Sequence, residues 1–317
     1  MITDTKKANT YISVILPVFN GGVYLAMSIQ SVLQQSMQHF ELLILDDCST
    51  DASWSYISSI KDARVSKFRN DINKGLFFNL NFLIKESKSE LIKLWSQDDI
   101  MYSNCLETTV EFHKKHPAVG FSYSGRDIID ETGEIKKSTE TDTTPEIISP
   151  HLHTSIAFFT GSIAGNIANV CLNREALNKV GLFREDMKIS ADFDMWVRIA
   201  KEHNIGFIRS NLIQLRDHDK QLSRNPGLLI YHVREDLEIF RNLLERCDKK
   251  TKREGRQMLR RRKMVFYYTL MLKSLLGGQV KNTLAYFKEL RSFDNFFLLT
   301  FFFFKAKISR PIKPNFK

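Results

Sequence analysis

Short apolar runs alternate with segments of helical periodicity over the first hundred residues, and this alternation constrains the fold more than any other feature. The apolar runs, typical of buried strands, span residues 11–19, 40–45, 64–69 and 90–95. Between them apolar residues recur every three or four positions, which predicts helices, at residues 25–33, 52–61 and 76–87. Strands and helices in this order predict an α/β fold with a doubly wound, mainly parallel sheet covered on both faces.

Polar side chains follow three of these predicted strands at the point where each strand ends. Asn20 follows the first strand, Asp46 and Asp47 the second, and Asp98 and Asp99 the fourth. Ligands of open α/β sheets bind outside the carboxyl ends of the strands. The sequence therefore predicts a binding site on one rim of the sheet, because solubility alone would not require acids at several strand ends.

The chain continues with further strands and helices. Residues 119–135 are typical of a strand and a hairpin, and residues 138–150 of a polar loop. A strand then leads into a helix that Asn173 caps and Gly181 ends. Ser190 begins another helix, and we find no internal repeat.

The two acidic pairs suit different tasks. One such pair after a strand is common turn chemistry, but two on one rim favour a ligand site. A nucleoside diphosphate binds with a hard divalent cation, which takes oxygen ligands from one or two carboxylates and from the phosphates. Asp99, with Asp98 beside it, suits that cation. Asp46 and Asp47 suit hydrogen bonds from a base N–H or a ribose hydroxyl.

Seven stretches of the chain resemble, in order, the motifs of glycosyltransferase family 2, the inverting nucleotide-sugar transferases with the GT-A fold. The resemblance covers roughly residues 11–225, and it is specific as a set although each piece alone is weak. The stretches are SVILPVFNGG, ILDDCSTDAS, NKG, LWSQDD, GNIANVCLNREALNKVGLF, ADFDMWVRIA and LRDHDKQLS.

The resemblance implies a role for each candidate residue. Asp99 would be the direct ligand of Mn²⁺ or Mg²⁺, and Asp192 the catalytic base. The nucleotide would be bound by Pro17, Phe19, Asn20, Asp46, Asp47, Asn73, Gly75 and Asp98. The acceptor or the diphosphate would be contacted by Trp196, Arg216 and His218. Trp196 is equally well explained as a core residue. His218 is also explained by an ordinary structural role.

Asp192 has independent chemical support as a base. A positioned carboxylate that takes the proton of an attacking hydroxyl contributes about 10²- to 10⁴-fold. Asp192 lies at the predicted start of a helix, whose positive end should keep it ionised. The plain alternative is a carboxylate that only stabilises the helix start.

The chain also departs from the family pattern. Members often have Gly, Arg, an acidic residue and Glu where this chain has Cys48, Leu80, Gln97 and Ala191 respectively. The missing Arg leaves the donor open, and Ala191 weakens any second acidic contact to the acceptor.

Basic residues gather in the last part of the chain, which we predict as a helical region after a catalytic domain of residues 1–227. Residues 228–317 hold 21 Lys and Arg against 8 Asp and Glu, and residues 296–304 are almost wholly apolar. Aromatic segments beside basic residues suit the surface of an anionic membrane. The alternative is packing on the catalytic domain or a homo-oligomer. No nucleic-acid recognition motif accompanies the charge.

The remaining composition predicts a cytoplasmic protein at the inner face of the cell membrane. The four cysteines are scattered without metal-ligand spacing, which favours a reducing compartment. We expect no signal peptide, because the start is polar, and no spanning helix, because no apolar run reaches about 20 residues.

These observations predict an inverting glycosyltransferase that moves a sugar, with a UDP-sugar favoured, to a lipid-linked glycan of O-antigen or capsule synthesis. Two other classes stay open. One is a degenerate member that binds nucleotide and serves as an assembly partner. The other is a nucleotidyltransferase, although this chain lacks the glycine-rich basic loop expected after its first strand.

Overall fold

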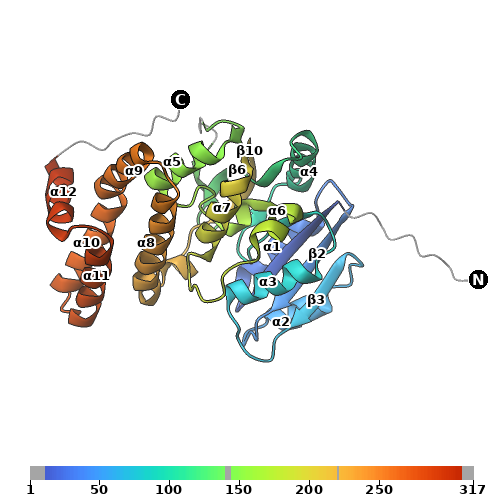
Figure 1. The fold of residues 1–317 in the computed structure, drawn as a ribbon. Helices are drawn as coiled ribbons and strands as arrows, with labels where there is room; N and C mark the ends of the chain where they lie inside the picture. Colours follow the sequence, from blue (N-terminus) through green and yellow to red (C-terminus); the bar gives the residue numbers. More distant parts are fainter. Residues whose placement is uncertain (1–10, 140–143, 220, 309–317) are drawn as a thin grey trace, which may run out of the picture. The chain divides into compact units, whose positions relative to one another are not determined.

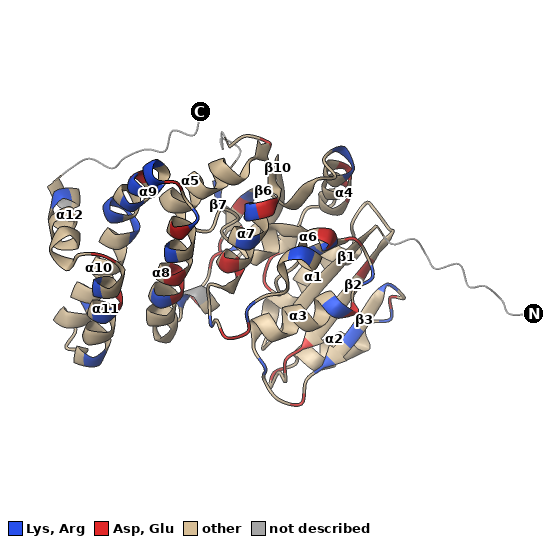
Figure 2. Cartoon of the chain, in the orientation of Figure 1, with Lys and Arg blue, Asp and Glu red and all other residues tan. Residues whose placement is uncertain are grey.

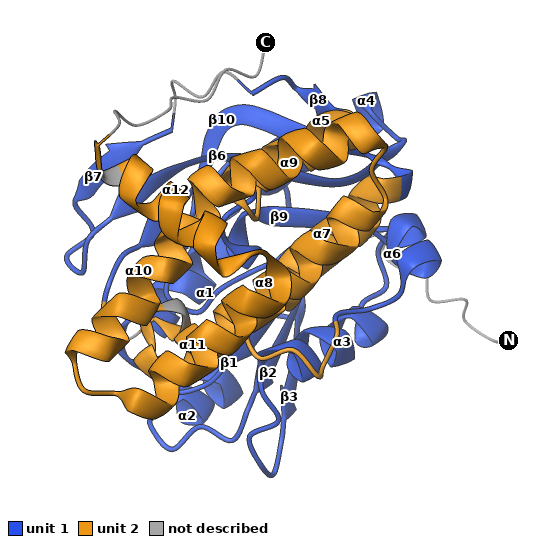
Figure 3. Ribbon diagram, turned by 60° about the vertical axis from the view of Figure 1, so that its left-hand side comes forward, with its two compact units in different colours: residues 1–148, 164–183, 202–218 blue, residues 149–163, 184–201, 219–317 orange. Residues whose placement is uncertain are grey.

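A computed structural model describes residues 11–139, 144–219 and 221–308 (Figure 1). These residues form two compact units, coloured in Figure 3. The first, here called the sheet unit, takes the described residues up to 148, with 164–183 and 202–218. The second, the helical unit, takes residues 149–163 and 184–201 and the described residues from 219.

The sheet unit is built on one mixed sheet with the strand order β3-β2-β1-β4-β9-β6-β10-β5. Strands β3, β2, β1 and β4 run parallel, β9 is antiparallel to both its neighbours, and β6 and β10 are again parallel. Short β7 pairs with β6, and β8 with β10. The strands are β1 (Ile12–Val18), β2 (Phe40–Asp46), β3 (Val65–Arg69), β4 (Leu91–Leu94), β5 (Ile100–Met101), β6 (Val119–Ile129), β7 (Ile135–Ser138), β8 (Ile147–Ile148), β9 (Val170–Asn173) and β10 (Asn204–Arg216).

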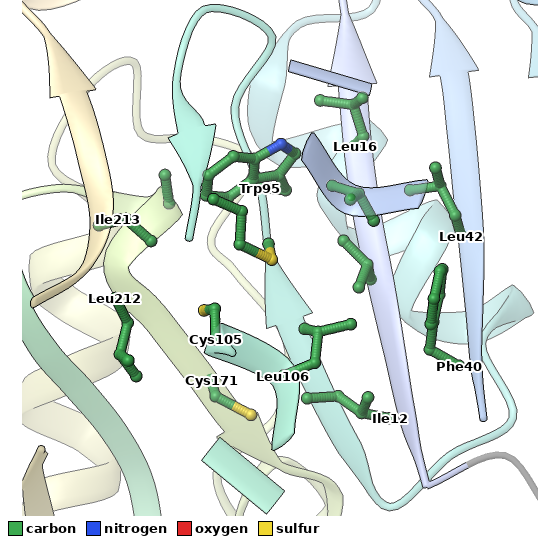
Figure 4. Packing of buried hydrophobic residues seen from close by; sticks show 14 of the residues in the cluster. Ile12, Leu16, Phe40, Leu42, Trp95, Cys105, Leu106, Cys171, Leu212 and Ile213 are labelled. Atoms are coloured by element: carbon green, nitrogen blue, oxygen red, sulfur yellow. The ribbon is translucent and has the colours of Figure 1, made fainter. Parts of the chain in front are cut away.

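Helices of the sheet unit cover this sheet because each presents an apolar face. They are α1 (Leu25–Leu33), α2 (Ser53–Ser59), α3 (Leu76–Glu86), α4 (Cys105–Lys115) and α6 (Arg174–Val180). Alternate residues of β1, from Ile12 to Val18, pack with α1 and α4 in a buried cluster (Figure 4). Trp95 in this cluster donates from Nε1 to Ser28 Oγ over 2.9 Å, which ties α1 to the end of β4.

The structure confirms the strands and helices predicted for the first hundred residues. Asn173 caps α6 by accepting from Glu175 N, and Gly181 ends that helix with a φ of 81°. Residues 140–143 of the predicted polar loop lie outside the described residues, while β8 occupies part of the rest.

Three long elements were not predicted, each for a local reason. The register of β10 shifts around Asn211, so its alternation is interrupted. The sequence of α4 is polar apart from its inward face. Helix α5 (Pro150–Thr160) begins at the end of the predicted polar loop. Its start, where Ser149 caps the helix by accepting from Leu152 N and Pro150 is the first helical residue, falls within the residues predicted as that loop.

Seven helices form the helical unit within the described residues. They are α5, α7 (Ala191–Glu202), α8 (Leu229–Glu245), α9 (Lys249–Arg261), α10 (Lys263–Leu276), α11 (Val280–Phe293) and α12 (Phe296–Ile308). A second apolar cluster joins α8, α10, α11 and α12. Helices α5 and α7 belong to this unit as well, although the predicted domain boundary after residue 227 placed them with the sheet. The division into two domains after residue 227 stays a prediction.

Basic side chains are frequent on the helices of the helical unit, above all on α9 (Figure 2). Across the described residues, none of the helices combines the length and apolar character needed to cross a bilayer.

Candidate functional site

The ends of β1 and β4 form the switch point of the sheet. The chain passes from β1 to β2 on one side, while β4 adds on the other side, and ligands of such sheets bind at this kind of position. The amide of Gln97 ties the two strand ends, because Oε1 accepts from Phe19 N at 2.9 Å and Nε2 donates to Phe19 O at 3.1 Å. This contact explains an amide where family members often have an acid. The side chain of Phe19 itself is exposed on the rim, next to half-buried Pro17 in β1.

Two residues of this rim have left-handed backbone. Asn20 has a φ of 49° and Cys48 a φ of 61°, which side-chain-bearing residues adopt at a cost of about 1 kcal/mol or more. Asn20 Oδ1 accepts from Thr50 N at 2.8 Å, and Asn20 N donates to Ser49 Oγ at 2.9 Å. The loops after β1 and β2 are therefore held together, and the Gly common in the family at Cys48 matches the backbone conformation there.

Asp47 organises the loop after β3. Its carboxylate accepts from Asn70 Nδ2 and Lys74 N, both at 2.8 Å, and from Gly75 N at 2.9 Å. Gly75 has a φ of 87° with ψ of 164°, a conformation that favours glycine. The structure thus brings Asp47 and Gly75 together. Asn73 is exposed in the same loop, between the end of β3 and Gly75.

Asp46 lies behind the rim. It is fully buried, one oxygen accepts from Ser49 N at 3.2 Å, and the same oxygen lies 3.3 Å from Arg69 Nε. A fully buried carboxylate contacts a ligand only if the loop around it moves. Asp46 supports this loop through Oδ2, while its Oδ1 has no hydrogen-bond partner among the described residues. The predicted contact with the nucleotide stays a prediction.

Asp99 and Arg216 build the floor beside the switch point. Asp99 is 2% exposed, and its Oδ1 accepts from Arg216 N at 2.9 Å. The guanidinium of Arg216 donates to the carbonyls of Asp98, Asp130 and Glu131 at 2.8–3.1 Å. A contact from Arg216 to a diphosphate would need these bonds to break. Burial, and next the charge of Asp98, raise the pKa of Asp99 well above its usual range. Its Oδ2 is buried without a hydrogen-bond partner among the described residues, and the predicted role of Asp99 as a metal ligand stays a prediction.

Asp98 and His218 face each other across the same floor. His218 Nε2 lies 3.0 Å from Asp98 Oδ2, while Ser96 Oγ donates to Asp98 Oδ1 at 2.7 Å. The ring of Tyr24 lies 5.4 Å from the imidazole. A carboxylate is a preferred ligand of Mn²⁺ and Mg²⁺, and an imidazole is a common ligand of divalent transition-metal ions. Among the described residues no three or more His, Cys, Asp or Glu side chains are grouped to hold a metal, so further ligands would have to come from a bound diphosphate.

The two other predicted residues, Asp192 and Trp196, lie in the helical unit. Asp192 is partly exposed in the first turn of α7 and accepts from Phe193 N at 2.7 Å. Burial raises its pKa to about 6, outweighing that hydrogen bond, so the helix start does not hold the pKa low. The carboxylate is still mainly ionised at pH 7. Trp196 is fully buried, which supports its reading as a core residue.

Sequence reasoning missed several polar residues around these positions. Tyr24 follows Gly22, and Asn70 directly follows β3, a predicted strand. These positions after predicted elements could have marked both residues as candidates for the site. No motif marks Glu235 and Asp236 of α8, which contact the segment before α7, or His232, which lies against Asp236. They lie about 45 residues further along the chain.

Comparison with known proteins decides the family. The model of glycosyl transferase family 2 matches residues 13–179, more than half of the chain. The chain belongs to glycosyl transferase family 2. A glycosyltransferase of Rickettsia felis without characterised activity is 28% identical over 71% of this chain, which spans only 38% of that protein.

One further relative and one solved structure are named proteins. WfgD of Escherichia coli, named as a UDP-Glc:α-D-GlcNAc-diphosphoundecaprenol β-1,3-glucosyltransferase, is 27% identical over 64% of this chain and 74% of its own. TarS of S. aureus (residues 1–349) superposes with a TM-score of 0.65 at 18% identity, over 89% of this chain and 81% of that chain. The TarS likeness confirms the predicted GT-A fold class with its helical extension.

Proposed function

We propose that this protein transfers a sugar from a nucleoside diphosphate donor, with UDP favoured, to a hydroxyl of a lipid-linked saccharide. The observation that carries the proposal is the Asp98–His218 pair at the β1/β4 switch point, on the same rim as the loop that Asp47 holds. That rim offers acceptors for a nucleoside and donors for a cation on one sheet. The activity in WfgD's name, which uses a UDP-sugar and a diphosphoundecaprenol-linked acceptor, supports these proposed substrate classes.

A divalent cation, Mn²⁺ or Mg²⁺, fits the pair better than it fits Asp99. Asp98 and His218, whose side chains are 16% and 9% exposed, are held by Ser96 and Tyr24. Asp99 is only 2% exposed; its Oδ1 accepts from Arg216 N, while its Oδ2 has no hydrogen-bond partner among the described residues. When bound, such a cation would offset negative charge on the departing nucleoside diphosphate. The chain's own contribution is to orient these two donors on one floor.

Asp192 is the proposed base. It takes the proton of the acceptor hydroxyl while the oxygen attacks the anomeric carbon from the face opposite the diphosphate. The bond from that carbon to the diphosphate oxygen breaks, so the configuration inverts in one step. A carboxylate with a pKa of about 6 is mostly free to accept a proton at pH 7 and is more basic than an ordinary aspartate.

We further propose that α12 holds the protein on the cytoplasmic face of an anionic membrane, as an acceptor for surface polysaccharide synthesis would require. Its exposed residues Phe297, Phe301, Phe304 and Ile308 follow a helical stripe and are 85%, 58%, 61% and 87% exposed. Leu299 and Phe303 on the same helix are buried against the unit. Exposed Lys305 lies beside Phe301, which suits acidic headgroups.

Vesicle sedimentation tests the membrane contact. The full chain should sediment with phosphatidylglycerol-rich vesicles and much less with phosphatidylcholine vesicles. Phe301→Ser with Phe304→Ser should abolish this, while Ile135→Ser, an exposed apolar residue of β7, should not. A wild-type chain that stays in the supernatant with both vesicles contradicts the proposal, and self-association that depends on the same stripe favours the homo-oligomer instead.

A thermal-shift panel tests the donor site. Ligands that bind only the folded state raise its stability by mass action. UDP-sugars with Mn²⁺ should raise the melting temperature more than GDP- or dTDP-sugars, and transfer from UDP-glucose to GlcNAc-diphosphoundecaprenol, or to related acceptors, should follow. Binding without transfer to any acceptor favours the degenerate assembly partner. Pyrophosphate release from a nucleoside triphosphate favours the nucleotidyltransferase.

A further inference from the structure

The segment that leads into α7 is fixed by a buried carboxylate of α8. Glu235 accepts from three successive backbone N–H groups, those of Lys188, Ile189 and Ser190, at 2.7–3.0 Å. Buried carboxylates are stable only when such donors satisfy them. Because Ser190 immediately precedes α7, this contact fixes where the helix begins.

Asp236, the next residue of α8, joins that segment to two other side chains. Its Oδ1 accepts from Ser190 Oγ at 2.8 Å, and its Oδ2 accepts from Tyr267 Oη of α10 at 2.5 Å. His232, one turn earlier on α8, places Nε2 3.2 Å from the same Oδ2. Both Asp236 and Tyr267 are buried, so this is a satisfied polar network of the kind that fixes geometry.

The network contacts Ser190, two residues before Asp192, and its charges bear on the pKa of Asp192. After burial, the carboxylate of Asp236 raises the pKa of Asp192 and the imidazole of His232 lowers it. Burial lowers the pKa of His232, but the hydrogen bond and charge of Asp236 outweigh it and the pKa is raised. Burial raises the pKa of Asp236. The hydrogen bond from His232 and the charges of His232 and Lys263 outweigh burial, so the pKa of Asp236 is lowered overall. The other charged groups at this end of α7 are Glu235 and the Asp194–Arg198 pair.

We propose that His232 and Asp236 of α8, locked by Tyr267 of α10, are positioning residues that hold Asp192 at the start of α7 and set its charge. This rests on the proposed function, in which Asp192 is the base. Members of the family often have Glu before the base, where this chain has Ala191. Here a carboxylate near the base comes instead from another helix, and its oxygens are fully used within the protein.

Titration of the full chain labelled with [γ-¹³C]aspartate tests this directly. The resonance of Asp192 is assigned by its loss in Asp192→Asn. His232→Gln removes a positive charge, so the Asp192 titration should move to higher pH, by roughly half a pH unit. Asp236→Asn removes a negative charge but also the partner that raises the pKa of His232, so the two effects oppose each other and the Asp192 titration should move less than in His232→Gln. His151→Gln, which alters an exposed histidine of α5, should leave it in place.

The acid limb of kcat/KM should move to higher pH in His232→Gln, as the titration does, and less in Asp236→Asn, which a merely structural role would not produce. His232 is 38% exposed, so its substitution keeps the test valid if Asp236→Asn does not fold, and Tyr267→Phe gives a second mild variant with a smaller shift. A folded His232→Gln that leaves both the titration and the limb unmoved overturns the inference. Shifted titrations with full transfer in Asp192→Asn would overturn the base assignment instead, while the charge coupling stands.

Discussion

The sheet unit and the helical unit build their polar sites by different means. In the sheet unit, polar residues follow strand ends directly, so Asn20, Asp47 and Asp98 reach one rim through the topology alone. In the helical unit, Asp192 begins a helix and depends on side chains of α8 and α10 that are distant in sequence. The comparison teaches that a site set by topology is visible in motifs, whereas a site set by helix packing is not.

Substitution of Asp98 and of Asp99 on the sheet rim should have the largest effect, because it separates a proposed cation ligand from an acid that bonds the backbone of Arg216. Asp98→Asn, or His218→Gln, should lower transfer about 100-fold or more and weaken the Mn²⁺ dependence, because each removes a proposed cation donor. Asp99→Asn keeps an oxygen for Arg216 N and should retain most activity. Steady-state kinetics across a Mn²⁺ titration measures this, and equal losses in Asp98→Asn and Asp99→Asn would contradict the assignment.

The same acids could be found from the sequence, but their roles could not. The strand-end position of Asp98 and Asp99 follows from a local pattern. Which of the two turns inward is decided by Arg216 N, a partner 117 residues away on β10. That strand was itself missed, because its register shifts at Asn211. Likewise, α8 shows an amphipathic pattern, and nothing in that pattern states that Glu235 and Asp236 face the start of α7.

The helical unit should carry a stability penalty at its polar site. The pKa of Asp192 is raised to about 6 by burial, above its unfolded value, so the folded state binds the extra proton between about pH 4 and 6. Stability from this group is present below that window and is lost as pH rises through it. Asp192→Asn should therefore be more stable than wild type by up to about 3 kcal/mol at pH 7.5, with the difference vanishing near pH 4.

Chemical denaturation at both pH values measures that difference. Asp219→Asn, which alters an almost fully exposed carboxylate, is the matched control and should show no such pH dependence. A variant less stable than wild type at pH 7.5 would show that Asp192 stabilises the start of α7 more than its burial opposes it.

The sheet rim should show a smaller penalty, held in its backbone. Cys48 adopts a φ of 61°, and its Sγ lies 3.3 Å from Asp71 O. Cys48→Gly should relieve the strain and raise the free energy of unfolding by up to about 1 kcal/mol, less what the weak thiol contact and the greater freedom of unfolded glycine subtract. A urea titration at constant m-value detects this change. A loss of stability would show that the thiol contact stabilises the fold by more than the backbone strain destabilises it.

Asp192→Asn, assayed in parallel for transfer and for UDP binding, tests most directly whether Asp192 is the base of the transfer step and takes no part in binding the nucleotide. We expect the rate of transfer to fall about 10²- to 10⁴-fold while the affinity for UDP with Mn²⁺, measured by calorimetry, stays within twofold of wild type. Transfer at the wild-type rate would contradict this division of roles, and so would a UDP affinity that falls together with the rate.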